Sequence, residues 1–301
     1  MENTREIFDL SSLCQHRARA ARSGGKAEFL FAESAARLVD RLADIKRHFT
    51  VALELGCRDG ALARRMLGER KADQVIASDI APAFLIRAPA PSLLADAEAL
   101  PFAPRSFDLV LSNLALHWTN DLPGALLQLR HALRPDGLLL ATLFSGGTLQ
   151  ELREAWLAAE SDLENGASPR VSPFADARDL AALLQRAGFA LPVVDTDTLT
   201  ATYSDALALM RDLRDMGETN ALRERRRNFT RRATLLRAAT IYQERFARPD
   251  GRIAATFEIT TLTAWAPAES QQQPLPRGSA AARLAQALGT QEHKAGDKAR
   301  P

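Results

Sequence analysis

Three acidic residues that accompany apolar, strand-like runs are the part of this sequence best suited to hold a ligand. Glu54 lies inside the first run, and Asp79 and Asp96 directly follow the second and third. The first run leads into a turn that contains Gly56 and Gly60, and a helical pattern comes next. A strand, a glycine turn and a helix in this order bring the backbone close to a nucleotide-like ligand, and carboxylates at strand ends can accept its hydroxyl or amino groups.

Two classes of ligand fit such a turn. A dinucleotide site needs the spacing G-x-G-x-x-G or A, in which the second glycine lets the backbone approach the pyrophosphate. Gly56 and Ala61 match this spacing, but Arg58 stands at the second glycine. S-adenosyl-L-methionine (AdoMet) has no pyrophosphate, and Glu54, the glycines and the later acids resemble the AdoMet site of class I methyltransferases. Arg58 departs from that pattern too, and we expect its guanidinium to contact the methionine carboxylate. A turn without a ligand is the remaining alternative.

The residues at the strand ends have separate expected roles. Asp79 is expected to accept the ribose hydroxyls, and Asp96 the adenine amino group, with backbone contacts from Ala97. His117 follows the fourth strand and could act as a general base or orient a substrate, or it could only wall the pocket together with Trp118. The expected cofactor contacts are Glu54, Gly56, Cys57, Arg58, Gly60, Asp79, Ile80, Asp96, Ala97, Asn113 and Leu114.

Composition limits the classes of protein that fit. The 301 residues are 46% hydrophobic, enough for one large α/β core with appendages, and a net charge of +2 gives no support for nucleic-acid binding. Cys14 and Cys57 are too few for a disulfide framework or for the three thiolates of a radical-AdoMet cluster. No histidine begins an H-x-D or H-x-E pair, so no metal site is expected. No membrane span or secretory signal is visible, which predicts a cytoplasmic protein.

The order of strand-like and helical patterns predicts a doubly wound, mostly parallel, seven-stranded α/β sheet of the Rossmann-like methyltransferase type. Residues 1–50 are expected to form a helical cover, and 51–145 the AdoMet-binding core. Residues 146–267 should complete the sheet, with a helical substrate lid at about 204–254, and 268–301 should be a mobile tail. The strands are expected near 51–55, 75–79, 92–95, 107–113, 137–144, 189–203 and 255–265.

Two basic stretches allow two interpretations each. The arginines at 17–22 predict either a solvated helix end or a segment that covers the cofactor mouth. The arginines at 223–232, inside the expected lid, are best interpreted as a solvated face, although some could point inward and grip a carboxylate or an acidic partner.

Longer segments resemble one family in particular, the methyltransferase-fold complex I assembly factor 5 group, whose mitochondrial member is known as an arginine hydroxylase of a complex I subunit. The resemblance implies a protein substrate in respiratory complex I, modified by arginine hydroxylation or by methylation, in a bacterial-type chain. The matching segments are 116–123 (LHWTNDLP), 148–153 (TLQELR), 172–174 (SPF), 186–189 (RAGF), 194–197 (VDTD), 216–220 (MGETN) and 277–280 (RGSA).

A second resemblance keeps other functions open. The malonyl-acyl-carrier-protein O-methyltransferase of biotin synthesis also has a Leu-His-Trp stretch and a Gly-x-x-Asn lid element, which here end at Trp118 and Asn220. This makes His117 and Asn220 the candidate catalytic residues. In that alternative the lid arginines would hold a small carboxylate on a carrier protein. A non-catalytic, AdoMet-binding assembly scaffold is the alternative of a different class.

Overall fold

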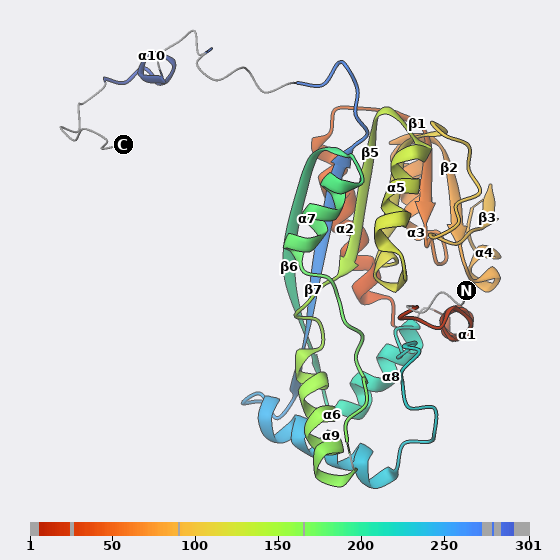
Figure 1. Cartoon of the computed structure of the whole chain (residues 1–301), viewed down its shortest axis with the longest axis vertical. Coiled ribbons are helices and arrows are strands. Elements are labelled where there is room, and N and C mark those ends of the chain that lie inside the picture. The colour runs from red at the N-terminus through yellow and green to blue at the C-terminus, as the bar shows by residue number, and fades with distance from the viewer. Residues whose placement is uncertain are drawn as a thin grey trace. The chain divides into compact units, whose positions relative to one another are not determined.

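The computed structural model describes residues 6–24, 27–89, 91–164, 166–272, 279 and 284–291 (Figure 1). The chain divides into two compact units, residues 1–267 and 268–301. The second unit contains the short helix α10 (Leu284–Leu288). Much of the expected mobile tail, and the 277–280 motif except Ser279, lie outside the described residues.

The first unit is built on one seven-stranded sheet in the order β3-β2-β1-β4-β5-β7-β6. Strands β1 to β5 pair in parallel, and β7 is antiparallel to both β5 and β6. This confirms the predicted fold class. The strands are β1 (Phe49–Leu55), β2 (Ala72–Asp79), β3 (Ser92–Leu94), β4 (Phe107–Asn113), β5 (Leu133–Phe144), β6 (Ala190–Tyr203) and β7 (Ile253–Trp265).

Helices cover both faces of this sheet (Figure 1). Helices α2 (Phe29–Asp44) and α3 (Ala61–Gly68) bury their apolar sides against one face, where they meet alternate residues of β4 such as Leu109. Helices α5 (Leu122–Ala132) and α7 (Ala177–Arg186) do the same on the other face, where Val110 points. Since successive side chains of a strand point to opposite faces, a strand covered on both sides is largely apolar, as the central residues of β4 are.

A helical layer lies beyond the carboxyl ends of the central strands (Figure 1). It contains α8 (Ala206–Met216) and α9 (Arg232–Phe246), which are inserted between β6 and β7 where the sequence predicts a lid. Helix α6 (Gln150–Leu163), which precedes the insertion in sequence, shares the same apolar cluster and packs against α9. The helical layer is therefore larger than the insertion alone.

The first helix, α1 (Leu10–Ser23), packs on α4 (Pro82–Leu85) and on α8. Its Ala20 and Ala21 are buried against Ala81 and Phe84. Arg17 is 3% exposed, which does not fit the first of the two interpretations of the arginines at 17–22, a solvated helix end. The alternative interpretation, a segment that covers the cofactor mouth, agrees with this packing.

Candidate functional site

The glycine turn after β1 can be built only with glycine at its two special positions. Gly56 and Gly60 have φ values of 73° and 75°, in the left-handed region that costs most other residues free energy. A Cβ on Gly56 would overlap the Cβ of Ala115, and one on Gly60 would overlap Pro89. The turn is thus packed tightly against the loop that follows β4, and its backbone lies at the carboxyl edge of the sheet.

Glu54 stabilises this turn by linking β1 to the start of α3. Its carboxylate is buried and accepts a hydrogen bond from the backbone N–H of Ala63 at 3.0 Å, in the first turn of α3. Burial raises the pKa of Glu54 to about 8, although the bond from Ala63 opposes the shift. Glu54 also borders a cavity of about 110 Å³ beside Gly56 and Asn113.

Asp79 is held by an ion pair that the sequence did not reveal. It ends β2 and is buried, and its carboxylate accepts two hydrogen bonds from the guanidinium of Arg17 of α1, one of them from Nε at 3.0 Å. The backbone N–H groups of Arg58 and Ala81 donate to the same carboxylate at 3.0 and 2.9 Å. Arg17 therefore occupies the acceptor that was predicted for the ribose hydroxyls.

Asp96, Ala97 and Ile80 lie together at the neighbouring strand ends. They line a cavity of about 50 Å³ that is closed on one side by Leu13 and Arg17 of α1. A cavity of that size holds one or two waters rather than a nucleoside. The acceptors expected around the cofactor are thus present at one edge, where the side chains of Leu13 and Arg17 occupy part of the space that a ligand as large as AdoMet would need.

Arg58 bridges the glycine turn to other elements. Its guanidinium donates to the Glu28 carboxylate, with the shorter bond 2.7 Å from Nη2, and to the backbone oxygen of Met216 at 2.9 Å from Nη1. It also lies 3.7 Å from the centre of the Phe31 ring. Arg58 therefore ties the turn to α2 and to the end of α8, and its contact with the methionine carboxylate stays a prediction.

The remaining expected cofactor residues have structural partners. Asn113, at the end of β4, donates from Nδ2 to the Phe31 oxygen at 2.9 Å and accepts from the Thr142 hydroxyl at 3.0 Å. Leu114 has a left-handed φ of 49° and is fully buried. Cys57 is a buried thiol in the glycine turn. None of these contacts tests a role in cofactor binding.

His117 and Trp118 share one carboxylate partner. In the short helix η1 (Leu116–Trp118), His117 Nε2 lies 3.1 Å from Oε2 of Glu218, and Trp118 Nε1 donates to the same oxygen at 2.9 Å. The rings of Phe144 and Phe174 lie 4.8 and 6.0 Å from the imidazole. Nδ1 of His117 is buried and has no partner within the described residues. Glu218 belongs to the 216–220 motif, which was noted in the sequence without a role for this residue.

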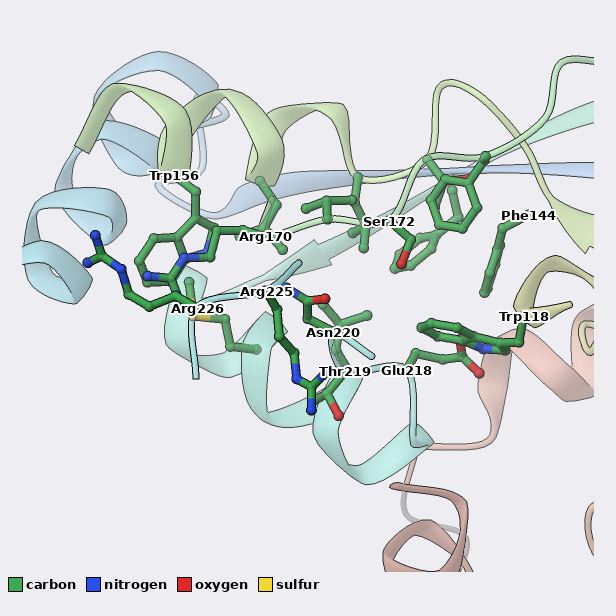
Figure 2. A pocket seen from close by; sticks show the side chains of 18 residues that line it. Trp118, Phe144, Trp156, Arg170, Ser172, Glu218, Thr219, Asn220, Arg225 and Arg226 are labelled. Carbon is green, nitrogen blue, oxygen red and sulfur yellow. The ribbon is translucent and has the colours of Figure 1, made fainter. Parts of the chain in front are cut away.

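A cavity of about 330 Å³ lies on the other side of Trp118 (Figure 2). Its floor is apolar, and the helical layer of α6 and α8 encloses it. Asn220 lines the cavity, but its side chain donates to the Pro169 oxygen at 2.7 Å and accepts from the Leu222 N–H at 2.9 Å. Because Trp118 also borders the smaller cavity at Asp96, it separates the expected cofactor side from this larger space.

Three arginines line the large cavity (Figure 2), and each forms an ion pair with a carboxylate of the chain. Arg170 pairs with Glu160 and lies 4.6 Å from the centre of the Trp156 ring. Arg225 pairs with Asp9 at 3.0 Å, and Arg226 with Glu164 at 3.2 Å. The favoured interpretation of the arginines at 223–232 was a solvated face, but Arg225 and Arg226 line the cavity, as the alternative allowed, and both are already paired with carboxylates.

Among the described residues, no group of three or more His, Cys, Asp or Glu side chains is arranged to hold a metal ion. None of the helices within the same part of the chain has the length and apolar character needed to cross a membrane.

Comparisons with known proteins match the sequence and the fold of this chain. Residues 53–141 match the model of a methyltransferase domain. The chain is 41% identical over 284 residues to the mitochondrial arginine-hydroxylase NDUFAF5 of Homo sapiens, covering 92% of this chain and 82% of that one. It is 39% identical over 241 residues to a malonyl-[acyl-carrier protein] O-methyltransferase of Halorhodospira halophila, covering 77% and 80%.

Solved structures show the same fold at low identity. The YcgJ protein of Bacillus subtilis has a TM-score of 0.55 at 14% identity, over 77% of this chain and 99% of that one. A phosphoethanolamine N-methyltransferase of Haemonchus contortus, solved with S-adenosyl-L-methionine, has a TM-score of 0.50 at 17% identity, over 80% and 56%. Together with the domain match, the comparisons confirm both predicted resemblances and the prediction that the chain is an enzyme whose cofactor is AdoMet.

Proposed function

This chain belongs to the family of the NDUFAF5 arginine hydroxylases. We propose that it uses its AdoMet-binding fold to modify an arginine side chain of another protein. The modification is methyl transfer from AdoMet, or hydroxylation with dioxygen as the oxygen source and an external two-electron reductant that carries the second oxygen atom to water. The protein substrate we propose is a subunit of respiratory complex I, in keeping with the sequence resemblance. We take α6 together with residues 204–254 as the substrate lid and residues 1–50 as the cofactor cover.

The main support for this proposal is that the three arginines lining the large cavity are already paired with carboxylates. A carboxylate substrate, as in the malonyl alternative, needs an arginine or lysine that is free to pair with it. Arg170, Arg225 and Arg226 are already paired with carboxylates of the chain, so a substrate carboxylate would have to displace those partners. Breaking a partly buried ion pair leaves a carboxylate without a partner at a considerable cost. The cavity is therefore better suited to a cationic side chain.

The chain's own residues have separate tasks in this proposal. Asp79 would hold the cofactor ribose once Arg17 releases it, and Asp96 would hold the adenine. When bound, AdoMet supplies a sulfonium with an activated methyl group. The lid and the aromatic residues beside His117 exclude water from the substrate, and exclusion of water strengthens each electrostatic contact inside the site. Asn220, which fixes the lid loop through Pro169, remains a candidate for orienting the substrate.

Deletion of the gene tests the proposed function. Mass spectrometry of complex I subunits from the deletion strain should show the loss of one oxygen atom, or of one methylene unit, from a specific arginine. Normal growth without biotin is expected. Unmodified and fully assembled complex I in the parent strain, with biotin dependence in the deletion strain, would favour the malonyl alternative. Restored assembly by an Asp79→Ala variant that no longer binds AdoMet would favour a scaffold.

A cytoplasmic location is proposed as well. Both cysteines, Cys14 and Cys57, are free thiols, which is usual in a reducing compartment. Fractionation of cells that express the tagged chain should recover it with cytoplasmic markers. Recovery with a membrane or secreted fraction would contradict this proposal.

A further inference from the structure

Glu218 is a buried carboxylate beside Trp118, the residue that separates the two cavities (Figure 2). Its side chain is 6% exposed, and it lines the large cavity close to Trp118. Burial raises the pKa of Glu218, but the hydrogen bond from His117 and the charges of His117, Arg58 and Arg17 outweigh this effect, so the pKa lies below its ordinary value. Glu218 is therefore an anion inside a largely apolar space.

The hydrogen bonds of Glu218 are unevenly distributed over its two oxygens. The ring N–H donors of His117 and Trp118 both reach Oε2. Oε1 has no hydrogen-bond partner in the part of the chain that the structure describes. A carboxylate can accept about four hydrogen bonds, so this group retains capacity for further donors.

Of the three charges that lower the pKa of Glu218, only that of His117 contacts Glu218 directly, and both arginines are paired with other carboxylates. Arg17 is paired with Asp79, and Arg58 with Glu28. Retaining an anion in a low-dielectric site is costly unless a cation joins it. The aromatic residues Trp118 and Phe144, which also line the cavity, present surfaces on which a flat cation can stack.

We infer that Glu218 is the specificity-determining residue that binds the guanidinium of the substrate arginine, through Oε1, while His117 and Trp118 hold its Oε2. This inference rests on the proposed function, since it assigns a residue to the recognition of the arginine. Guanidinium N–H groups and a carboxylate match in geometry as well as in charge. His117 then acts through Glu218 and is a positioning residue.

Calorimetry with small probes tests the assignment on the full chain with AdoMet bound. The probes are Nα-acetyl-arginine methylamide, its citrulline analogue, which has the same shape without the charge, and malonate. The unaltered protein should bind the arginine probe more tightly than the other two. Glu218→Gln should weaken the arginine probe by about 10- to 100-fold, the range for hydrogen bonds to a charged group, and leave the citrulline probe nearly unchanged.

A matched control is Glu224→Gln, which removes an exposed carboxylate of the same loop and should leave all probe affinities as they are. If Glu218→Gln is poorly folded by circular dichroism, Glu218→Ala serves as the second variant, with the same expectation. Equal binding of the arginine probe by Glu218→Gln and the unaltered protein would overturn the inference. So would the absence of arginine-probe binding, or tighter binding of malonate, by the unaltered protein.

One alternative role has its own readout. If Glu218 instead balances the sulfonium of the cofactor, Glu218→Gln would change the ratio of affinities for AdoMet and its demethylated product, which lacks that charge. We expect this ratio to stay constant, and a change of about tenfold would overturn the inference. The probe experiment requires no turnover, so its failure is distinct from a failure of the proposed function, which the cellular arginine modification reports.

Discussion

At the level of single residues, the buried ion pair of Arg17 and Asp79 can be tested by mutation. Arg17 competes with the ribose for the same carboxylate. Replacing it in Arg17→Met should therefore tighten AdoMet binding by about tenfold or more, because the binding-competent form becomes more populated. The free protein should lose about 3 kcal/mol of stability, since Asp79 is left buried without a cation. Calorimetry and thermal unfolding with and without AdoMet measure both effects.

The exposed Arg22 of the same helix provides the control, because Arg22→Met removes a charge without touching Asp79. Weaker AdoMet binding by Arg17→Met, with Arg22→Met unchanged, would mean that Arg17 contacts the cofactor itself. The hypothesis that Arg17 and the cofactor ribose compete for Asp79 would then be wrong.

Glu54 predicts a pH dependence of stability. Its pKa is about 8 in the folded chain, raised by burial from the ordinary value of 4.5. The folded state therefore binds a proton that the unfolded state releases above pH 4.5, and this contribution to stability is complete below pH 4.5 and lost as the pH rises to about 8. Relative to Glu54→Gln, the free energy of unfolding should fall by on the order of 5 kcal/mol across this window, about 1.4 kcal/mol for each pKa unit. Urea unfolding at several pH values measures the difference, and parallel pH profiles for the two proteins would contradict it.

At the level of elements, the turn between β1 and α3 depends on Gly56. Gly56→Ala combines a left-handed φ with an overlap at Ala115, so the turn or the loop after β4 must move. We expect a loss of about 2 kcal/mol or more in stability and weaker AdoMet binding. Gly68→Ala is the matched control, since Gly68 is helical with open space around its Cβ position, and it should be neutral or slightly stabilising. Unchanged AdoMet affinity in Gly56→Ala would argue that the turn does not approach the cofactor.

The bounds of the strands differ in how well the sequence could predict them. Strand β4 was predicted at its observed bounds because an apolar run covered on both faces is a local pattern. Strand β5 begins earlier than predicted, at Leu133 rather than 137. Residues 134–137 (Arg-Pro-Asp-Gly) are of types typical of a turn, and they lie at an irregularity in the pairing with β4, where Asp136 has a φ of 62°. Residues 134–137 therefore form a bulge inside β5, and they do not mark the start of this strand.

The residues of the candidate site also differ in whether the sequence could predict them. Glycines and acids at strand ends were found because each depends on a few neighbouring residues. The partners Arg17 of Asp79 and Glu218 of His117 are 62 and 101 residues away in sequence. Local periodicity contains no information about such a pairing, so the sequence left open whether the arginines at 17–22 are solvated or cover the cofactor mouth. Packing of α1 and the lid onto the sheet edge determines these contacts.

For the first unit as a whole, α1 and the lid loop are connected. The Asp9 N–H donates to the Ala221 oxygen at 2.8 Å, and its carboxylate pairs with Arg225 at 3.0 Å. Further along α1, Arg19 donates to the Thr219 hydroxyl at 3.1 Å. Displacement of Arg17 by the cofactor should therefore shift α1 and, through these contacts, the loop that carries Glu218. A ligand shifts a conformational equilibrium only through such differential contacts.

This coupling predicts a specific pattern of hydrogen exchange. AdoMet should speed the exchange of α1 amides and of residues 217–222 in the unaltered protein, because the α1 contacts to the sheet edge are released. Asp9→Asn keeps a side chain able to cap α1 but removes the charge that holds Arg225, so the response of α1 should persist while that of 217–222 becomes smaller. By reciprocity, the arginine probe should then affect AdoMet affinity less in Asp9→Asn than in the unaltered protein. Protection of α1 by AdoMet, or an equal response of 217–222 in both proteins, would mean that the cofactor enters without moving α1 and that the two sites are not linked through Asp9.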